Sequence, residues 1–139
     1  MNGPAIRRSE RFQVRLDLNS GVPVYRQIID QVLVAIASGA LKAGDQLPTV
    51  RQTSVDLSIN PNTVMRAYRE LEIRGVLTTQ QGTGTFIAPA EVKPDEAERQ
   101  RRLSQLVGEL GARAGREGFT LHEVMDRLGE LMAEQARRK

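Results

Sequence analysis

The chain has 139 residues, of which 40% are apolar and 27% charged, a composition that fits one small domain with an appendage and excludes a fibrous or wholly disordered protein. It contains no cysteine and one histidine, His122, which excludes disulfides, thiolate metal sites and a histidine relay. No apolar run approaches the ~20 residues of a membrane span, and no secretory signal is visible, so we expect a cytoplasmic protein without metal or cofactor.

The net charge of +3 is unevenly distributed along the chain. Residues 1–90 carry 10 basic and 7 acidic side chains, whereas residues 91–139 carry 10 of each. The basic excess therefore belongs to the first part, where it favours a nucleic-acid partner. We expect a basic tail at 1–11, a domain at 12–90 and a different, helical region at 91–139.

The first elements follow from the spacing of apolar residues. Alternation over 12–18 predicts a short half-buried strand or an extended arm. From Val24 to about Ser38, apolar residues recur every three or four positions, which predicts a core-facing helix that Gly39 ends.

A second, shorter helix is predicted to begin after Thr49, because Thr49 and Gln52 have the spacing of a capping box. Its expected apolar contacts are Val50, Val55 and Leu57.

A third helix begins sharply after Asn60, a good N-cap, with Pro61 at the first helical position. It is expected to run to Arg74, with Gly75 ending it. At 100° per residue, one face carries apolar residues that should pack on the earlier helices: Val64, Ala67, Tyr68 and Leu71. The opposite face carries Asn62, Met65, Arg66 and Arg69.

Two β-type runs, VLTTQ and TFIA, flank a glycine-rich turn and predict a hairpin. The turn consists of Gln81, Gly82, Thr83 and Gly84. Three helices followed by a hairpin are the order of a winged helix-turn-helix domain, which places its recognition helix in the major groove of DNA. We therefore predict a mainly α fold with a small β-hairpin.

The outward face of the third helix suits DNA, since arginine can bond guanine and asparagine can bond adenine. Thr63 and Arg51 are candidates for phosphate contacts, and the hairpin tip is a candidate wing in the minor groove. The alternatives are ordinary solvated arginines paired with Glu70, Glu72 or a nearby aspartate, and a plain tight turn.

Residues 91–139 predict two further helices. Asp95 can cap the first, Gly115 and Gly118 break it, and Thr120 with Glu123 forms a capping box for the second. Their apolar stripes are Leu103, Leu106, Val107 and Leu110, then Leu121, Val124, Met125, Leu128, Leu131 and Met132.

Two helices alone cannot enclose all of these apolar side chains, and small fragments seldom fold by themselves. We expect a second copy of the chain to cover them in a four-helix arrangement, making a two-helix dimerisation tail. The alternative is that the tail caps the winged domain of its own chain.

Residues 23–87 resemble the DNA-binding domain of the GntR family of bacterial transcription regulators. The matching segments are PVY at 23–25 with Gln27 and Ile28, GDQLPTVR at 44–51, NPNTV at 60–64, AYRELE at 67–72, and GVL at 75–77 leading into QGTGTF at 81–86. The resemblance implies DNA contacts from Arg51, from Asn62, Thr63 and Arg66, and from the loop around Gly82. Many members carry arginine where this chain has Pro61 and Met65, so the resemblance does not define the operator sequence.

The short two-helix tail resembles the YtrA subfamily of the GntR family. This resemblance implies a dimeric regulator, commonly a repressor, often of a transporter operon. We therefore interpret the chain as a homodimeric regulator of double-stranded DNA with an inverted-repeat operator. A small-molecule effector could bind between the tail helices and the winged domain, near Phe119, Met125 and Met132. The alternative functions are a protein-interaction adaptor and an enzyme, and for an enzyme the sequence offers no phosphate-binding loop, nucleophile elbow or metal-ligand cluster.

Overall fold

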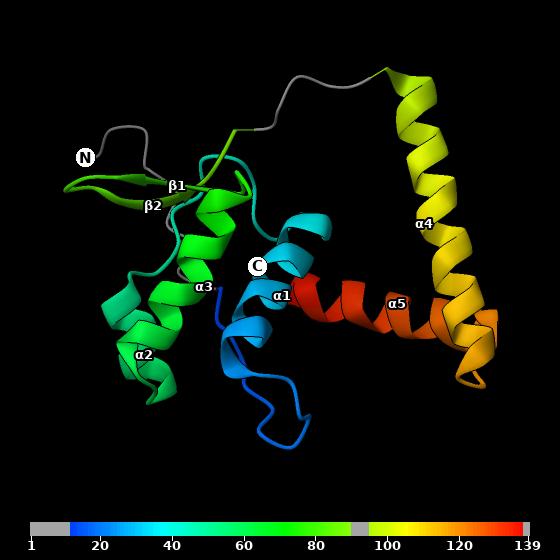
Figure 1. Cartoon of the computed structure of the whole chain (residues 1–139), viewed down its shortest axis with the longest axis horizontal. Coiled ribbons are helices and arrows are strands. Elements are labelled where there is room, and N and C mark those ends of the chain that lie inside the picture. Colours follow the sequence, from blue (N-terminus) through cyan, green and yellow to red (C-terminus); the bar gives the residue numbers. More distant parts are fainter. Residues whose placement is uncertain (1–11, 90–94, 138–139) are drawn as a thin grey trace. The chain divides into compact units, whose positions relative to one another are not determined.

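The computed structural model describes residues 12–89 and 95–137 (Figure 1). The fold is mainly α-helical with one β-hairpin, as predicted. Its elements are α1 (Val24–Ala37), α2 (Val50–Leu57), α3 (Pro61–Ile73), β1 (Leu77–Gln80), β2 (Gly84–Ile87), α4 (Glu96–Arg116) and α5 (Leu121–Arg137).

The chain divides between Pro89 and Ala90 into two compact units, the first with three helices and the hairpin and the second with α4 and α5. The basic tail predicted at 1–11 lies outside the described residues. The roles assigned to 12–90 and 91–139 stay predictions.

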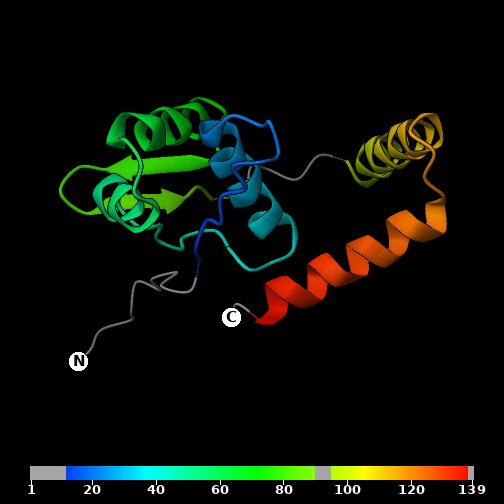
Figure 2. The ribbon, with the colours of Figure 1, turned by 90° about the horizontal axis from the view of Figure 1, so that it is seen from below.

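The first unit is built around α3, which packs against α1, α2 and β1 (Figure 2). The apolar stripes of α1 and α3 face each other, as their three- and four-residue spacing predicts. Burying each large aliphatic side chain contributes ~1.5–3 kcal/mol. The largest fully buried side chains are Ile28, Ile29, Val32, Leu41, Val64 and Leu71.

The hairpin is antiparallel, with Leu77 opposite Ile87 and Gln80 opposite Gly84. The loop that precedes α2 pairs with the outer edge of β2. The Ile87 N–H donates to the Asp45 carbonyl oxygen at 2.8 Å, and the Leu47 N–H donates to Thr85 at 2.9 Å. These hydrogen bonds attach the loop before α2 to the hairpin, so they position α2 relative to the hairpin.

The predicted element at 12–18 is an extended arm rather than a strand. Side-chain amides of α1 take the place of a neighbouring strand, because the Arg15 N–H donates to Gln31 Oε1 at 2.9 Å and Gln31 Nε2 donates back to the Arg15 carbonyl at 2.7 Å. Gln27 makes the same two-way pairing with Asp17 at 2.8 and 2.9 Å. Leu18 follows the last of these hydrogen-bonded residues and is 80% exposed, so the predicted burial of alternate residues is wrong at the C-terminal end of the arm.

The predicted helix starts are confirmed where a side-chain cap is present. The Thr49 hydroxyl accepts from the Gln52 N–H, and Gln52 Oε1 accepts from the Thr49 N–H, both at 3.0 Å. Asn60 Oδ1 accepts from the Asn62 N–H at 2.8 Å. Thr120 and Glu123 form the second capping box.

Three local expectations are wrong. Asp95 stands at the N-cap of α4, but its side chain makes no cap hydrogen bond. Val55 is 67% exposed, because α2 is short and only its other faces meet the core. α4 continues through Gly115 to Arg116, and the break falls at Gly118, whose φ of +85° suits a glycine.

Candidate nucleic-acid interface

The face of α3 that points away from the core carries polar and basic side chains. Val64, Ala67, Tyr68 and Leu71 are buried, so the predicted orientation of the helix is confirmed. Asn62, Met65, Arg66 and Arg69 are all exposed, and Thr63 at the first turn is half-buried.

Two arginines of this region remain available for an anionic ligand. Arg51 in the first turn of α2 and Arg69 on α3 are exposed, and neither makes an ion pair within the described residues. The aspartate pairing considered for Arg51 is therefore not observed. Both guanidinium groups can donate two parallel hydrogen bonds to a phosphate or a base edge.

Arg66 has partners within the protein. Its guanidinium carbon lies 3.7 Å from the centroid of the Tyr25 ring, and its Nε lies 4.0 Å from Glu70 Oε1. Glu70 also faces Arg74 at 3.9 Å. The pairing with Glu70 was one of the alternatives drawn from the sequence, whereas the contact with Tyr25 on α1 was not predicted.

The turn between α2 and α3 is fixed by a buried tyrosine. The Tyr68 hydroxyl donates to the Pro48 carbonyl oxygen at 2.7 Å. Its only proton is used there, so Thr53 Oγ1, at 3.3 Å, is the donor in the second bond. Burial raises the pKa of Tyr68, and the bond from Thr53 acts in the opposite direction. The sequence placed Tyr68 on the inner face but gave no sign of these partners.

We expect Tyr68→Phe to lower the free energy of unfolding by about 1 kcal/mol at pH 7.5, because the Pro48 carbonyl and the Thr53 hydroxyl lose a partner. The raised pKa means that the folded protein holds the phenol proton more tightly than the unfolded chain. The stability due to this group is therefore fully present below pH 10 and falls as pH rises through the folded pKa.

The difference in unfolding free energy between wild type and Tyr68→Phe should therefore become smaller above pH 10. Urea unfolding at several pH values measures this difference. Tyr25→Phe is the matched control, with an expected change within about 0.5 kcal/mol, because the Tyr25 hydroxyl has no hydrogen bond within the described residues. A gap that widens at high pH would contradict the assignment.

The hairpin tip is held from outside by Gln46. Its Nε2 donates to the Thr83 carbonyl oxygen at 3.1 Å, and the Thr83 N–H donates to Gln80 at 2.9 Å. Gly82 and Gly84 have φ of +80° and +138°. Three of the four predicted tip residues, Gln81, Gly82 and Thr83, form the turn, whereas Gly84 is the first residue of β2. Gln46 was missed because nothing in its local sequence points across 37 residues to Thr83.

Gly84→Ala should lower the free energy of unfolding by about 1–3 kcal/mol, since φ at this position is strained for any residue with a side chain. The added Cβ would also lie 2.5 Å from Gln46 Nε2 and displace it. Gly82→Ala is the control for a positive φ, because its added Cβ would enter open space. Chemical unfolding should show a larger loss of unfolding free energy for Gly84→Ala than for Gly82→Ala. If Gly84→Ala cost as much in a Gln46→Ala background as in wild type, the clash with Gln46 would contribute nothing to the loss.

The second unit leaves most of its apolar residues exposed. Of the ten side chains predicted to form the dimer face, eight are exposed and two half-buried. The exposed ones are Leu103, Leu106, Val107, Leu110, Leu121, Met125, Leu128 and Met132, and the half-buried ones are Val124 and Leu131.

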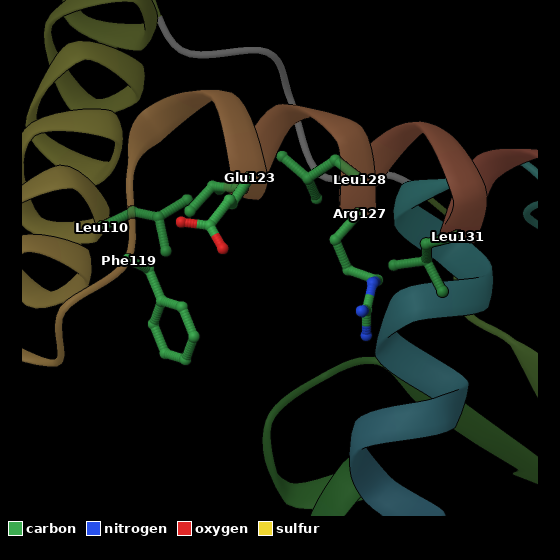
Figure 3. Close-up of a pocket in the computed structure, with 7 residues that line it drawn as sticks. Leu110, Phe119, Glu123, Arg127, Leu128 and Leu131 are labelled. Atoms are coloured by element: carbon green, nitrogen blue, oxygen red, sulfur yellow. The ribbon is translucent and has the colours of Figure 1, made fainter.

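A hollow of about 350 Å³ lies between α4 and α5 (Figure 3). Leu110 and Phe119 stand at one end and Leu131 at the other. Phe119 was predicted near an effector, but Met125 and Met132 do not line the hollow. Its complete lining is Leu110, Phe119, Glu123, Val124, Arg127, Leu128 and Leu131. The effector site predicted between the tail helices and the winged domain stays a prediction.

Within residues 12–89 and 95–137, no cluster of three or more acidic or histidine side chains could hold a metal ion. No helix in the same part of the chain is both long enough and apolar enough to cross a bilayer.

A helix-turn-helix with an exposed polar recognition face, followed by a glycine-tipped hairpin that the preceding loop braces, defines a winged helix-turn-helix protein. Residues 24–87 match the family described as bacterial regulatory proteins, gntR family. The chain belongs to the GntR family, as the sequence motifs predicted. It is thus related to regulatory proteins rather than to enzymes.

Two relatives and one solved structure extend this finding. The chain is 43% identical over 75 residues to the HTH-type transcriptional repressor YtrA of Bacillus subtilis, covering 54% of this chain but only 58% of that protein. It is 38% identical over 98 residues to an HTH-type transcriptional regulator of Mycobacterium tuberculosis, covering 70% and 79% of the two chains. The structure of YtrA from Sulfolobus acidocaldarius, a GntR-family transcription factor, matches with a TM-score of 0.53 and 32% identity over 71% of this chain and 97% of that one. The predicted likeness to YtrA is confirmed.

Proposed function

We propose that the protein is a dimeric transcription regulator of the cytoplasm that binds an inverted-repeat operator in double-stranded DNA and represses by occluding a promoter. The observation that carries this proposal is the exposed outer face of α3, with Arg69 on α3 and Arg51 in the first turn of α2 both free of ion pairs within the described residues. Phosphate neutralisation by such side chains supplies much of the affinity of DNA-binding proteins.

Each subunit would read one half-site. Arg69 suits the O6 and N7 acceptors of guanine, and Asn62 suits the N6 and N7 pair of adenine. Thr63, half-buried in the first turn of α3, can donate its hydroxyl to a phosphate. Met65, exposed on the same face, offers an apolar contact to a thymine methyl group.

The hairpin tip would serve as the wing. Gly82 and Gly84 lack the Cβ that would keep a backbone away from a sugar-phosphate chain, and Gln81 and Thr83 add hydrogen-bonding side chains. The grip of Gln46 on Thr83 supports this role, because it keeps the tip in one conformation before DNA arrives.

The dimer would form through the apolar faces of α4 and α5. Eight apolar side chains exposed to water on two helices are unfavourable in free energy. A second copy of the chain would cover them in a four-helix arrangement. A two-fold dimer reads half-sites about one helical turn, ~34 Å, apart. An intramolecular cap on the winged unit is the competing arrangement.

Repression is proposed because the Bacillus subtilis relative is named a transcriptional repressor. The resemblance to the YtrA subfamily extends the proposal to control of a transporter operon. A protein-interaction adaptor is the alternative function.

The test is selection of duplexes from a random-sequence pool, followed by molar-mass measurement with the enriched duplex across a salt series. We expect about 31 kDa for two copies of the 15.4 kDa chain, one duplex per dimer, and release as salt rises. A scrambled duplex of equal composition is the control. Failure to enrich any sequence would favour the adaptor, and a monomer with or without DNA would favour the intramolecular cap.

A further inference from the structure

An aromatic ring from α1 supports one arginine of the recognition face. The guanidinium carbon of Arg66 lies 3.7 Å from the centroid of the Tyr25 ring, a distance at which the positive charge interacts with the electron-rich face. Tyr25 is half-buried in the first turn of α1, whereas Arg66 projects from the middle of α3. The contact therefore joins the recognition helix to another helix through side chains that reach the outer surface.

The ring restrains a side chain that is otherwise mobile. An exposed arginine samples many rotamers, and each hydrogen bond that it makes to a ligand requires it to give up that freedom. A guanidinium stacked on a ring has its plane already set, so its forked donors are oriented before the ligand arrives.

The same ring also limits the ion pair between Arg66 and Glu70. Arg66 Nε is 4.0 Å from Glu70 Oε1, at the outer limit of an ion pair, while Glu70 also faces Arg74 at 3.9 Å. The Arg66 side chain still exposes 61% of its surface. Without the ring, the guanidinium would be free to close onto Glu70 and turn its donors away from the solvent.

We propose that Tyr25 is a positioning residue for DNA recognition, and that its ring holds the Arg66 guanidinium in the orientation from which it donates to the operator. This inference rests on the proposed function. Arg69, one position before Glu70 on the helix and without an ion pair among the described residues, has no such support, so the two arginines would bind DNA by different means: Arg66 pre-oriented and Arg69 ordered on binding.

The test distinguishes the effect of the Tyr25 ring on DNA binding from the effect of its hydroxyl and from a loss of fold stability. Tyr25→Leu removes the ring, and Tyr25→Phe keeps its face. Both are made in wild type and in an Arg66→Ala background, and binding is measured to a duplex that wild type enriches from a random pool and to a scrambled duplex. Thermal unfolding of each variant reports on the fold independently.

Tyr25→Leu should weaken binding to the enriched duplex by about 5- to 30-fold for a dimer, from the usual strength of an exposed cation–π contact counted once per subunit. Tyr25→Phe should stay within about twofold of wild type on the same scale. In the Arg66→Ala background, Tyr25→Leu should have no further effect, and the scrambled duplex should respond weakly throughout.

Arg66→Lys tests the same contact by changing the arginine, and it should leave the fold intact because Arg66 is exposed. Lysine keeps the charge but lacks the planar fork, so its loss of affinity should be at least as large as that of Tyr25→Leu. Equal effects of Tyr25→Leu with and without Arg66, or wild-type binding by Arg66→Lys, would overturn the inference while the proposed function stands. No enrichment of any duplex by wild type would overturn both.

Discussion

Leu128→Glu should convert the protein from a dimer into a monomer. Leu128 is 48% exposed on α5 and belongs to the apolar face that we propose as the subunit interface. In a dimer the substitution acts twice, because a two-fold axis places the same residue in both subunits. Two carboxylates would then be transferred from water into an apolar interface, which costs several kcal/mol each, while in the monomer they stay solvated. The dimer dissociation constant should rise by on the order of 1,000-fold.

Ala133→Glu is the matched control for this prediction. It adds the same charge to the same helix, at an exposed position about 140° around α5 from Leu128. Sedimentation or light scattering at several concentrations should give a dimer for Ala133→Glu and a monomer for Leu128→Glu. A Leu128→Glu protein that remains dimeric would contradict the proposed interface.

The loss of the dimer should carry over to DNA binding. A monomer contacts one half-site, so it loses the second set of contacts and binds the full operator little better than a single half-site. The winged unit should keep its cooperative unfolding, because its core is built from α1, α2, α3 and the hairpin. A Leu128→Glu monomer that keeps full operator affinity would show that the two-fold operator is wrong even if the interface is right.

The elements that the sequence predicted well depend on local rules. The orientation of α3 follows from apolar residues three and four positions apart, and its start follows from Asn60 and Pro61, whose effects act within one turn. The hairpin follows from β-type residues on either side of a glycine turn. None of these inferences needs a contact between distant parts of the chain.

The interactions that the sequence did not reveal join residues far apart along the chain. Tyr68 bonds Pro48, and Gln46 grips Thr83, through single polar atoms that leave no periodic signal. The Tyr25 ring beneath Arg66 is of the same kind, because helical spacing predicts which way a side chain leaves its helix but not what meets it. Candidate DNA-contacting residues could thus be found from the sequence, while the contacts that orient them could not.

The arm at 12–17 and the two-helix tail show a second limit of prediction from residue spacing. Alternating residues at the arm favoured a strand as much as an extended segment, and the choice was made by the side-chain amides of Gln27 and Gln31 on another element. In the tail, spacing predicted two amphipathic helices, but the partner for their apolar faces is not encoded in that spacing.

Arg69→Ala should weaken binding to the operator and relax its sequence preference, whereas Arg51→Ala should weaken binding to every duplex. Arg69 lies on the outer face of α3, where a bidentate contact to guanine is worth about 1–3 kcal/mol, or about 5- to 150-fold per half-site. Arg51 lies in the first turn of α2, the helix that crosses the DNA backbone in this class of domain. Its loss should therefore lower specific and scrambled binding alike and reduce the salt slope by about 1 per subunit.

Arg74→Ala removes the same charge from the far end of α3, where Arg74 already pairs with Glu70 at 3.9 Å, and it serves as the control for net charge. Binding titrations at several salt concentrations, with the enriched duplex, its single-base variants and a scrambled duplex, distinguish the cases. Arg69→Ala should flatten the response at one base pair of each half-site, while Arg74→Ala should keep the wild-type pattern. If Arg69→Ala lowered affinity equally for all duplexes, Arg69 would be a phosphate contact, and base recognition would have to come from Asn62, Met65 and the Arg66 that Tyr25 supports, because these are the other exposed side chains on that face.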